Sequence, residues 1–267
     1  MIIPLYTPVP GRAMRVAAFM SGSGTNLIKI LEHQKGLAAQ GGPPAYEITV
    51  IVTDTPSSNA SGIATAHNVP LVELDIKAFY RAHGRDSRRD LTLRPAFDRL
   101  IVERLAPFEP DTAVLAGYMS IVTYPLLEAF PGRMINVHPA DLRITEGGRR
   151  KYTGDRAVAD AILAGEPFLR ASTHIVREEV DCGEVLMVSD PLPVELPQGI
   201  TREELARPDN RTLLLRIASE HQDRLKRIGD WIILPRTLEL MAQGRYALDG
   251  SGTVYLDGVP CLSAPEA

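Results

Sequence analysis

Asn136 and His138 are two residues apart at the end of an apolar run, in the stretch "NVHP" that closes with Pro139. Side chains alternate along a strand, so the two would share a face, and open α/β sheets hold ligands at the carboxyl ends of their strands. An asparagine amide can donate to a developing oxyanion, and a histidine can exchange a proton near neutral pH. The pair is therefore a candidate catalytic centre.

A third polar candidate is Asp181, in the acidic turn "EEVDCGEV". A carboxylate there could bind the His138 imidazolium, raise its pKa and position a water molecule. Aspartate is also simply common in turns, so the turn alone decides nothing. We interpret the adjacent Cys182 as incidental and His174, on the preceding predicted strand, as a structural histidine.

The stretch "FMSGSGTNL" at 19–27 follows the first predicted strand and opens the first predicted helix. Glycines let a backbone approach a ligand closely, and a helix N-terminus attracts a phosphate. The dinucleotide fingerprint needs a third glycine where Leu27 stands, which favours a single phosphate over NAD. An ordinary capped turn is the alternative interpretation.

The remaining composition excludes several classes of function. With 29 basic and 33 acidic side chains the net charge is −4, so we expect neither nucleic acid nor an anionic membrane as partner. The histidines and two cysteines show no metal-ligand spacing, so no metal is predicted, and so few cysteines favour the cytoplasm. We interpret the basic cluster at 149–151 as a solvated loop.

Short apolar runs alternate with amphipathic stretches, which predicts an α/β fold with a doubly wound, mostly parallel sheet. Strands are expected at 14–20, 46–54, 69–74, 111–117 and 133–138, and helices from Thr25, over 59–68 and over 91–108, with a loop at 37–45. The stretch 172–194 predicts an added antiparallel pair, and 201–243 a long helical region.

These patterns divide the chain into three segments. Residues 1–13 contain three prolines and are expected to form a loose N-terminal extension. Residues 14–245 form the main domain. Residues 246–267 are expected to be a hairpin and tail packed on the same domain.

In order and spacing these motifs resemble the folate-dependent formyltransferases, most closely the branch that acts on phosphoribosylglycinamide. The similarity lies in "VAAFMSGSGTNLIKIL", "PDTAVLAGYMSIV", "GRMINVHPADL" and "STHIVREEVDCGEVLMVSDPLPV". The resemblance implies a Rossmann-like formyltransferase fold, small-molecule substrates and a monomer or homodimer. It also implies formyl transfer from 10-formyltetrahydrofolate to the substrate's amine, in purine biosynthesis.

The resemblance also implies roles for residues. The catalytic trio would be Asn136, His138 and Asp181. The phosphate would be bound by Gly24, Thr25 and Asn26. The folate would be bound by Arg94, Met119, Ser120, Ile121, Val122 and Asn136. Asp230 would hold the substrate amine.

Two departures leave the amine substrate open. The stretch "ADLRITEGGRRKYTGD" after "NVHP" replaces the usual Ser-Leu-Leu-Pro run, and Ser120 stands where the purine enzyme commonly has arginine. The chain could therefore formylate another primary amine, such as an amino sugar nucleotide. It could also be a weakly active folate- or phosphate-binding homologue.

Overall fold

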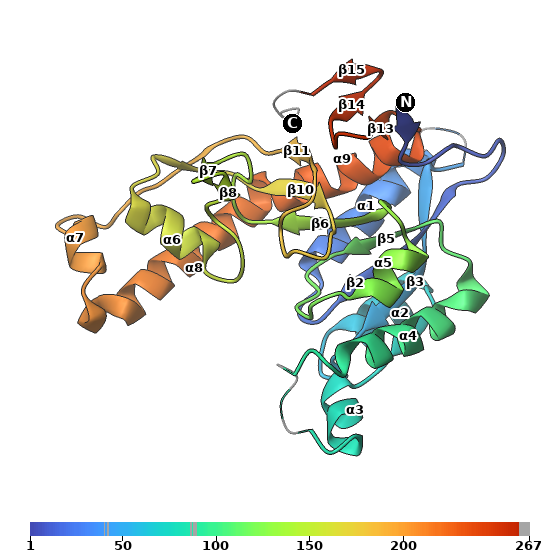
Figure 1. Ribbon diagram of the computed structural model, residues 1–267, viewed down its shortest axis with the longest axis horizontal. Coiled ribbons are helices and arrows are strands. Elements are labelled where there is room, and N and C mark those ends of the chain that lie inside the picture. The colour runs from blue at the N-terminus through green and yellow to red at the C-terminus, as the bar shows by residue number, and fades with distance from the viewer. Residues whose placement is uncertain (40, 42, 86, 88–89, 262–267) are drawn as a thin grey trace.

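In the computed structural model, which describes residues 1–39, 41, 43–85, 87 and 90–261, a seven-stranded sheet lies at the centre (Figure 1). Its strand order is β11-β10-β6-β5-β2-β3-β4. The strands are β2 Met14–Met20, β3 Tyr46–Thr53, β4 Leu71–Glu73, β5 Thr112–Leu115, β6 Met134–His138, β10 Ser172–Ile175 and β11 Val185–Val188. The five strands from β6 to β4 pair in parallel, whereas β10 is antiparallel to both its neighbours, β6 and β11. The predicted mostly parallel sheet with an antiparallel part is confirmed.

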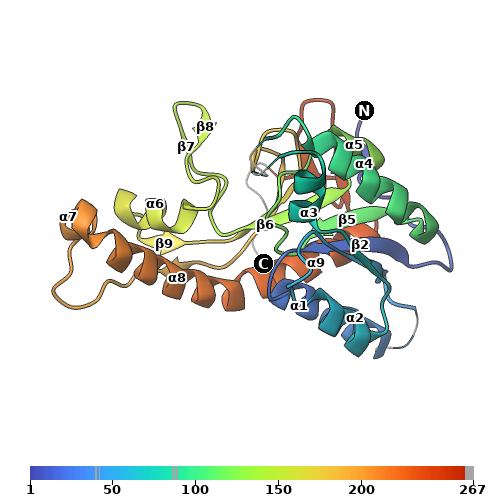
Figure 2. The same cartoon turned by 90° about the horizontal axis from the view of Figure 1, so that it is seen from below.

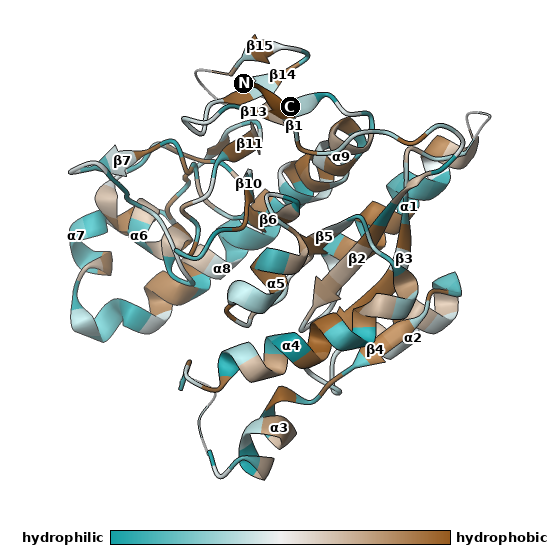
Figure 3. Cartoon of the chain, turned by 45° about the vertical axis from the view of Figure 1, so that its right-hand side comes forward, coloured by the Kyte–Doolittle hydropathy of each residue, from teal (hydrophilic) through white to brown (hydrophobic). Residues whose placement is uncertain are grey.

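The central strands are apolar on both faces because helices cover both faces. In β5, Val114 belongs to one core cluster, while Ala113 and Leu115 belong to the other. The first face is covered by α1 Thr25–Ala39, α2 Ala60–His67 and α9 Asp230–Ala242, and the second by α3 Ile76–Ala82, α4 Arg94–Leu105 and α5 Tyr124–Ala129. Figure 3 shows the hydrophobic colour concentrated on β2, β3 and β5. This is the doubly wound arrangement that the alternating pattern predicts.

Two local predictions were wrong. The expected loop at 37–45 begins later, because α1 continues to Ala39. Helix α3 was not predicted, although Asp75 caps it by accepting hydrogen bonds from the N–H groups of Lys77 and Ala78. A helix of seven residues is too short to show a clear 3.6-residue pattern. The capping aspartate was therefore the signal in the sequence that could have predicted it.

The helical region predicted at 201–243 is broken into pieces. It comprises α7 Arg202–Leu205, η2 Pro208–Asn210, α8 Arg211–Ile228 and α9. Helices α7 and α8, together with α6 Ala157–Ala164, form an arm beside the sheet (Figure 2). The break between α8 and α9 lies at Gly229, where a Cβ would be 2.7 Å from the carbonyl oxygen of Leu225. Glycine therefore permits the bend that places Asp230 at the start of α9.

The expectation of a loose N-terminal extension was wrong. Strand β1 Ile3–Pro4 pairs with β13 Tyr246–Leu248 and extends the C-terminal hairpin of β13, β14 Val254–Leu256 and β15 Val259–Pro260. Leu5 and Tyr6 are both buried. The prolines stop a helix from forming here, but the apolar side chains next to them still gain by leaving water.

The C-terminal hairpin packs against the main sheet. The Tyr246 hydroxyl donates to the carbonyl oxygen of Leu186 at 3.0 Å, and Val254 is buried in the main core. Residues 262–267 of the predicted tail lie outside the described residues. In the part of the chain that the structure describes, no helix is long and apolar enough to cross a membrane.

Candidate active site

The paired strands β6 and β10 position three of the polar candidates. In their register His174 lies opposite Asn136, and Ser172 lies opposite His138. Asn136 Nδ2 is 3.3 Å from His174 Nε2. His174 was interpreted from the sequence as structural, but it contacts the predicted site directly. Only the antiparallel register reveals this, because the two residues are 38 positions apart.

Asp181 lies between two histidines. Its Oδ2 is 3.4 Å from His138 Nδ1, and its Oδ1 is 3.4 Å from His174 Nε2. All three side chains are buried, with at most 7% of any residue's surface exposed. The structure thus brings the predicted residues Asn136, His138 and Asp181 together, with His174 as the link between the amide and the carboxylate.

The turn that carries Asp181 has an unusual backbone. Asp181 has φ 57°, a left-handed conformation that few residues other than glycine, asparagine and aspartate adopt. A Cβ at Gly183 would lie 1.8 Å from the carbonyl oxygen of Ile175, so no other residue fits there. This turn is held in one shape that the chain would not adopt by itself.

The segment after "NVHP" supports the same turn from outside. Arg150 donates from Nη1 to the carbonyl oxygen of Asp181 at 2.8 Å and from Nη2 to that of Gly183 at 2.5 Å. The Gly154 N–H donates to Asp181 Oδ2 at 2.8 Å, and His138 Nε2 is 3.0 Å from the carbonyl oxygen of Tyr152. The interpretation of 149–151 as a solvated loop was therefore wrong for Arg150, which is half-buried because its guanidinium fills the hydrogen bonds of the turn.

Burial reverses the expected protonation of His138. Burial lowers the pKa of His138 below its ordinary value of 6.5, and this outweighs the carboxylate of Asp181, which raises it. Asp181 raises the pKa of His138 as predicted, but burial lowers it by more. Burial alone would raise the pKa of Asp181, but the hydrogen bond from His174, the charge of His138 and the Gly154 N–H bring it down to about 2.

The predicted phosphate-binding residues lie in a tight turn that leads into α1. Gly24 has φ 73°, and a Cβ there would be 2.4 Å from Ile63 Cδ1. The turn is joined to α2 by the Asn59 N–H, which donates to the carbonyl oxygen of Gly22 at 3.0 Å. Thr25 and Asn26 begin α1, where main-chain N–H groups have no earlier helical partner.

Asn26 also connects this turn to Asp230. Asn26 Nδ2 donates to Asp230 Oδ2 at 3.3 Å. Among the residues that the structure describes, Oδ1 of Asp230 has no hydrogen-bond partner, although it is buried. Burial raises the pKa of Asp230 to about 6. The structure therefore brings the predicted phosphate and amine residues together.

The residues predicted to bind folate point in different directions. Ser120 is buried and donates to Asp54 Oδ2, while Val122 is buried in the core under α4 and α5. Met119 and Ile121 are 67% and 40% exposed. Only these two of the four leave apolar surface free, because alternate residues turn inward.

Asp54, at the end of β3, was missed by sequence reasoning. Besides Ser120 it accepts a hydrogen bond from Ser21 Oγ at 2.7 Å, and Ser21 Oγ accepts from the Met119 N–H at 3.0 Å. One buried carboxylate thus ties the phosphate turn to the segment at 119–122. Its signal was its place at a strand end, directly after the apolar run.

Arg94, the remaining predicted folate residue, begins α4 and is buried. Its guanidinium carbon lies 5.7 Å from the ring centre of Tyr80 and 6.0 Å from that of Phe97. It interacts with Asp98, whose carboxylate accepts hydrogen bonds from the N–H and hydroxyl of Thr123 at 2.7 and 2.6 Å. Arg94 is thus linked through Asp98 to Thr123, the residue that follows the segment at 119–122.

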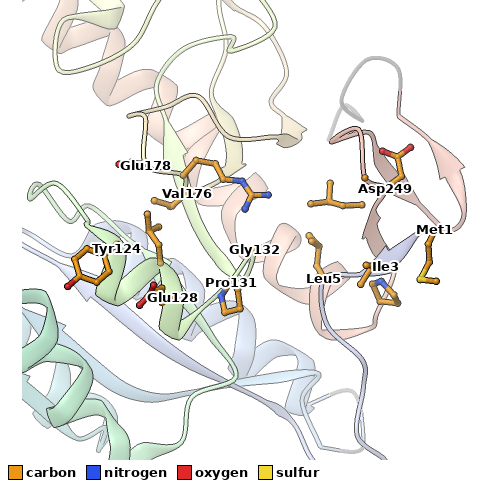
Figure 4. A pocket seen from close by; sticks show the side chains of 15 residues that line it. Met1, Ile3, Leu5, Tyr124, Glu128, Pro131, Gly132, Val176, Glu178 and Asp249 are labelled. Carbon is orange, nitrogen blue, oxygen red and sulfur yellow. The ribbon is translucent and has the colours of Figure 1, made fainter. Parts of the chain in front are cut away.

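Other features of the surface lie apart from this cluster. A groove of about 780 Å³ runs between β1, α5 and the C-terminal hairpin, and Ile3, Tyr124 and Val176 are among the residues that line it (Figure 4). None of the predicted site residues lines it. Within the described ranges, no group of three or more histidine, cysteine, aspartate or glutamate side chains is arranged to hold a metal ion.

A family model of formyl transferases matches residues 14–207, which include the phosphate turn, the β6 residues and Asp181. The chain belongs to the formyl transferase family. The predicted resemblance is thereby confirmed.

Relatives of this formyl transferase chain are similar over most of its length. A phosphoribosylglycinamide formyltransferase from Mycobacterium tuberculosis is 31% identical, over 72% of the chain and 76% of that protein. The trifunctional purine biosynthetic protein adenosine-3 of Bos taurus is 25% identical over 92% of the chain, which spans only 20% of that protein. The crystal structure of glycinamide ribonucleotide transformylase 1 from Symbiobacterium toebii has a TM-score of 0.64 and 28% identity, covering 93% of the chain and 99% of the solved one. This likeness confirms the predicted formyltransferase fold.

Proposed function

We propose that the protein transfers the formyl group of 10-formyltetrahydrofolate to the amine of phosphoribosylglycinamide, a reaction of purine biosynthesis. The observation that carries this proposal is the cluster at the end of β6, where the His138 imidazole contacts the Asp181 carboxylate and the Asn136 amide is linked to that carboxylate through His174. The relatives named for this reaction support it.

The acceptor substrate would lie between the phosphate turn and Asp230. The phosphate would accept hydrogen bonds from Gly24, Thr25 and Asn26 at the positive end of α1. The unpartnered Oδ1 of Asp230 would accept one from the substrate's amino group. The hydrogen bond between Asn26 and Asp230 fixes the spacing of these two contacts.

The formyl donor would approach from the segment at 119–122. The exposed side chains of Met119 and Ile121 offer apolar surface for a flat aromatic ring system. Asn136 lies on β6, next to the strand β5 that precedes this segment, and would donate to the formyl oxygen. We propose indirect roles for the buried Arg94, Ser120 and Val122, which would hold this segment in place rather than touch the donor.

Each side chain of the cluster would have a separate role in the reaction. The amide nitrogen of Asn136 can donate a hydrogen to the formyl oxygen as that oxygen gains negative charge. His138 is neutral near pH 7 and faces two acceptors, Asp181 Oδ2 and the Tyr152 carbonyl oxygen, of which a single N–H can serve only one.

Gaining a proton lets His138 serve both acceptors. It is therefore suited to take up the proton that the attacking amine loses and to return it to the folate nitrogen as the bond between that nitrogen and the formyl carbon breaks. Asp181 is ionised and stabilises the positive charge that His138 acquires.

We also propose the setting in which this chemistry takes place. The catalytic unit would be residues 14–245, with 1–13 and 246–267 packed on it. The protein would act on small molecules in the cytoplasm as a monomer or homodimer, without nucleic acid and without a metal.

One assay tests the proposal. Purified protein is mixed with 10-formyltetrahydrofolate and phosphoribosylglycinamide, and release of tetrahydrofolate is followed. We expect turnover with this amine and none with a panel of amino sugar nucleotides. Turnover with an amino sugar nucleotide alone would overturn the assignment of the acceptor and retain the chemistry. Binding of both substrates without turnover would mark a binding homologue and overturn the proposal.

A further inference from the structure

The turn that carries Asp181 needs an external support. Asp181 itself has a left-handed backbone, and the turn around it belongs to neither β10 nor β11. Such a conformation is unfavourable for most side chains and persists where surrounding contacts fix it. The side chain of Asp181 faces His138 on β6 and His174 on β10, so a small rotation of the turn would break both contacts.

Arg150 supplies that support through the main chain of the turn. Its two terminal nitrogens donate to the carbonyl oxygens of Asp181 and Gly183, at 2.8 and 2.5 Å. Because the guanidinium is planar and rigid, two such bonds fix the direction of both peptide groups at once. A lysine ammonium is a single point and cannot reproduce this fork.

A short hairpin brings Arg150 to the turn. Strands β7 Thr145–Glu146 and β8 Arg149–Arg150 pair in antiparallel fashion around Gly147 and Gly148, whose φ angles are 59° and 80°. Both angles favour glycine, as a two-residue hairpin turn requires. The same segment continues to Tyr152 and Gly154, which contact His138 and the Asp181 carboxylate.

We propose that Arg150 is a positioning residue that holds Asp181 in place for formyl transfer. This inference rests on the proposed function and assigns a task to the segment after "NVHP", which the resemblance to the family does not explain. Arg150 touches neither reacting atoms nor substrate and acts through the turn alone.

The test compares Arg150→Lys and Arg150→Ala with Arg149→Ala. Arg149 is the exposed neighbour on the same strand and serves as a matched control. We expect Arg150→Ala to lower kcat about 100-fold with KM nearly unchanged, because a misplaced catalytic group costs about this much. Arg150→Lys keeps the charge but loses the fork, so we expect most of the same loss, with Arg149→Ala like the wild type.

A second measurement is independent of activity. In the unliganded protein, NMR titration of the Asp181 carboxyl group reports its contacts with His138, His174 and the Gly154 N–H. We expect its pKa to rise toward the ordinary value in Arg150→Lys and to stay low in Arg149→Ala. Thermal unfolding shows whether each variant is folded. If Arg150→Ala does not fold, the comparison of Arg150→Lys with Arg149→Ala still tests the proposal.

The two proposals fail in different ways. An Arg150→Lys protein with wild-type kcat and a wild-type Asp181 titration would overturn the positioning role, and so would equal changes in Arg149→Ala. A wild-type protein that transfers formyl to no amine would overturn the proposed function, while the NMR titration would still test how Arg150 acts on Asp181.

Discussion

Asn26 and Asp230 lie 204 positions apart in the chain and are joined by a hydrogen bond of 3.3 Å. The bond connects the start of α1 to the start of α9, so the first and last helices that cover one face of the sheet meet at the predicted acceptor site. The break at Gly229 is what brings Asp230 there.

The first prediction concerns this buried carboxylate. Burial raises the pKa of Asp230 from 3.8 to about 6, so its favourable contribution to folding is full below about pH 4 and is lost as the pH rises through 6. Asp230→Asn removes the ionisation. As the pH rises from about 4 to about 8, we expect the free energy of unfolding of the variant to increase by about 3 kcal/mol relative to that of the wild type. Urea denaturation at each pH measures this difference. KM for the amine substrate should rise.

Asp223→Asn is the control, because Asp223 is exposed on α8. Its free energy of unfolding should depend on pH in the same way as that of the wild type. The same pH dependence for Asp230→Asn as well would contradict the assignment of a buried, proton-binding carboxylate.

The second prediction compares two glycines of the phosphate turn. Gly24→Ala places a Cβ 2.4 Å from Ile63 Cδ1 at a φ of 73° and should cost about 1–3 kcal/mol of stability, with weaker binding of the phosphorylated substrate. Gly22→Ala is the matched control, because a Cβ there meets nothing within 4 Å. Denaturant unfolding and KM measure the two effects. Equal effects of both substitutions would exclude a tight fit at Gly24.

The third prediction concerns Asp181. Asp181→Asn keeps the left-handed turn, which asparagine tolerates, and removes the negative charge. We expect kcat to fall about 100- to 1000-fold. The pKa of His138 should fall further below 6.5, because the Asp181 carboxylate is what opposes the effect of burial. Rate measurements and an NMR titration of His138 check both, and an unchanged rate would refute the catalytic trio.

The fourth prediction concerns His174, which connects Asn136 to Asp181. His174→Ala removes the hydrogen bond that lowers the pKa of Asp181. The acidic limb of the kcat profile should therefore move to higher pH, and kcat should fall at least about tenfold. His67→Ala, at an exposed histidine on α2, should leave both unchanged. A pH profile that does not move in His174→Ala would return His174 to a purely structural role.

The sequence predicted the parts of the molecule that local patterns determine. Strand β2 is apolar without interruption from Val16 to Met20, and Asn136 and His138 stand at the end of β6, after its apolar first residues. The trio with Asp181 was proposed from the resemblance to the formyltransferases, which the order of the motifs supports.

What the sequence could not predict depends on contacts between distant segments. His174 joins the cluster only through the antiparallel register of β10 with β6, and Arg150 joins it only through a turn 31 residues away. The lowered pKa of His138 follows from its burial, and burial cannot be predicted from the residue type alone. Leu5 and Tyr6 similarly lie in a proline-rich stretch that local signals indicate to be loose.

The hairpin and the Asp181 turn cannot be treated as separate modules in protein engineering. A graft that replaces residues 140–155 to admit a different amine would also remove the Arg150 fork, the Gly154 N–H and the Tyr152 carbonyl contact from the acid–base cluster. A successful graft must therefore carry these three contacts with it or bring its own matching turn. Changes of acceptor in this protein are then expected to require paired substitutions in both segments.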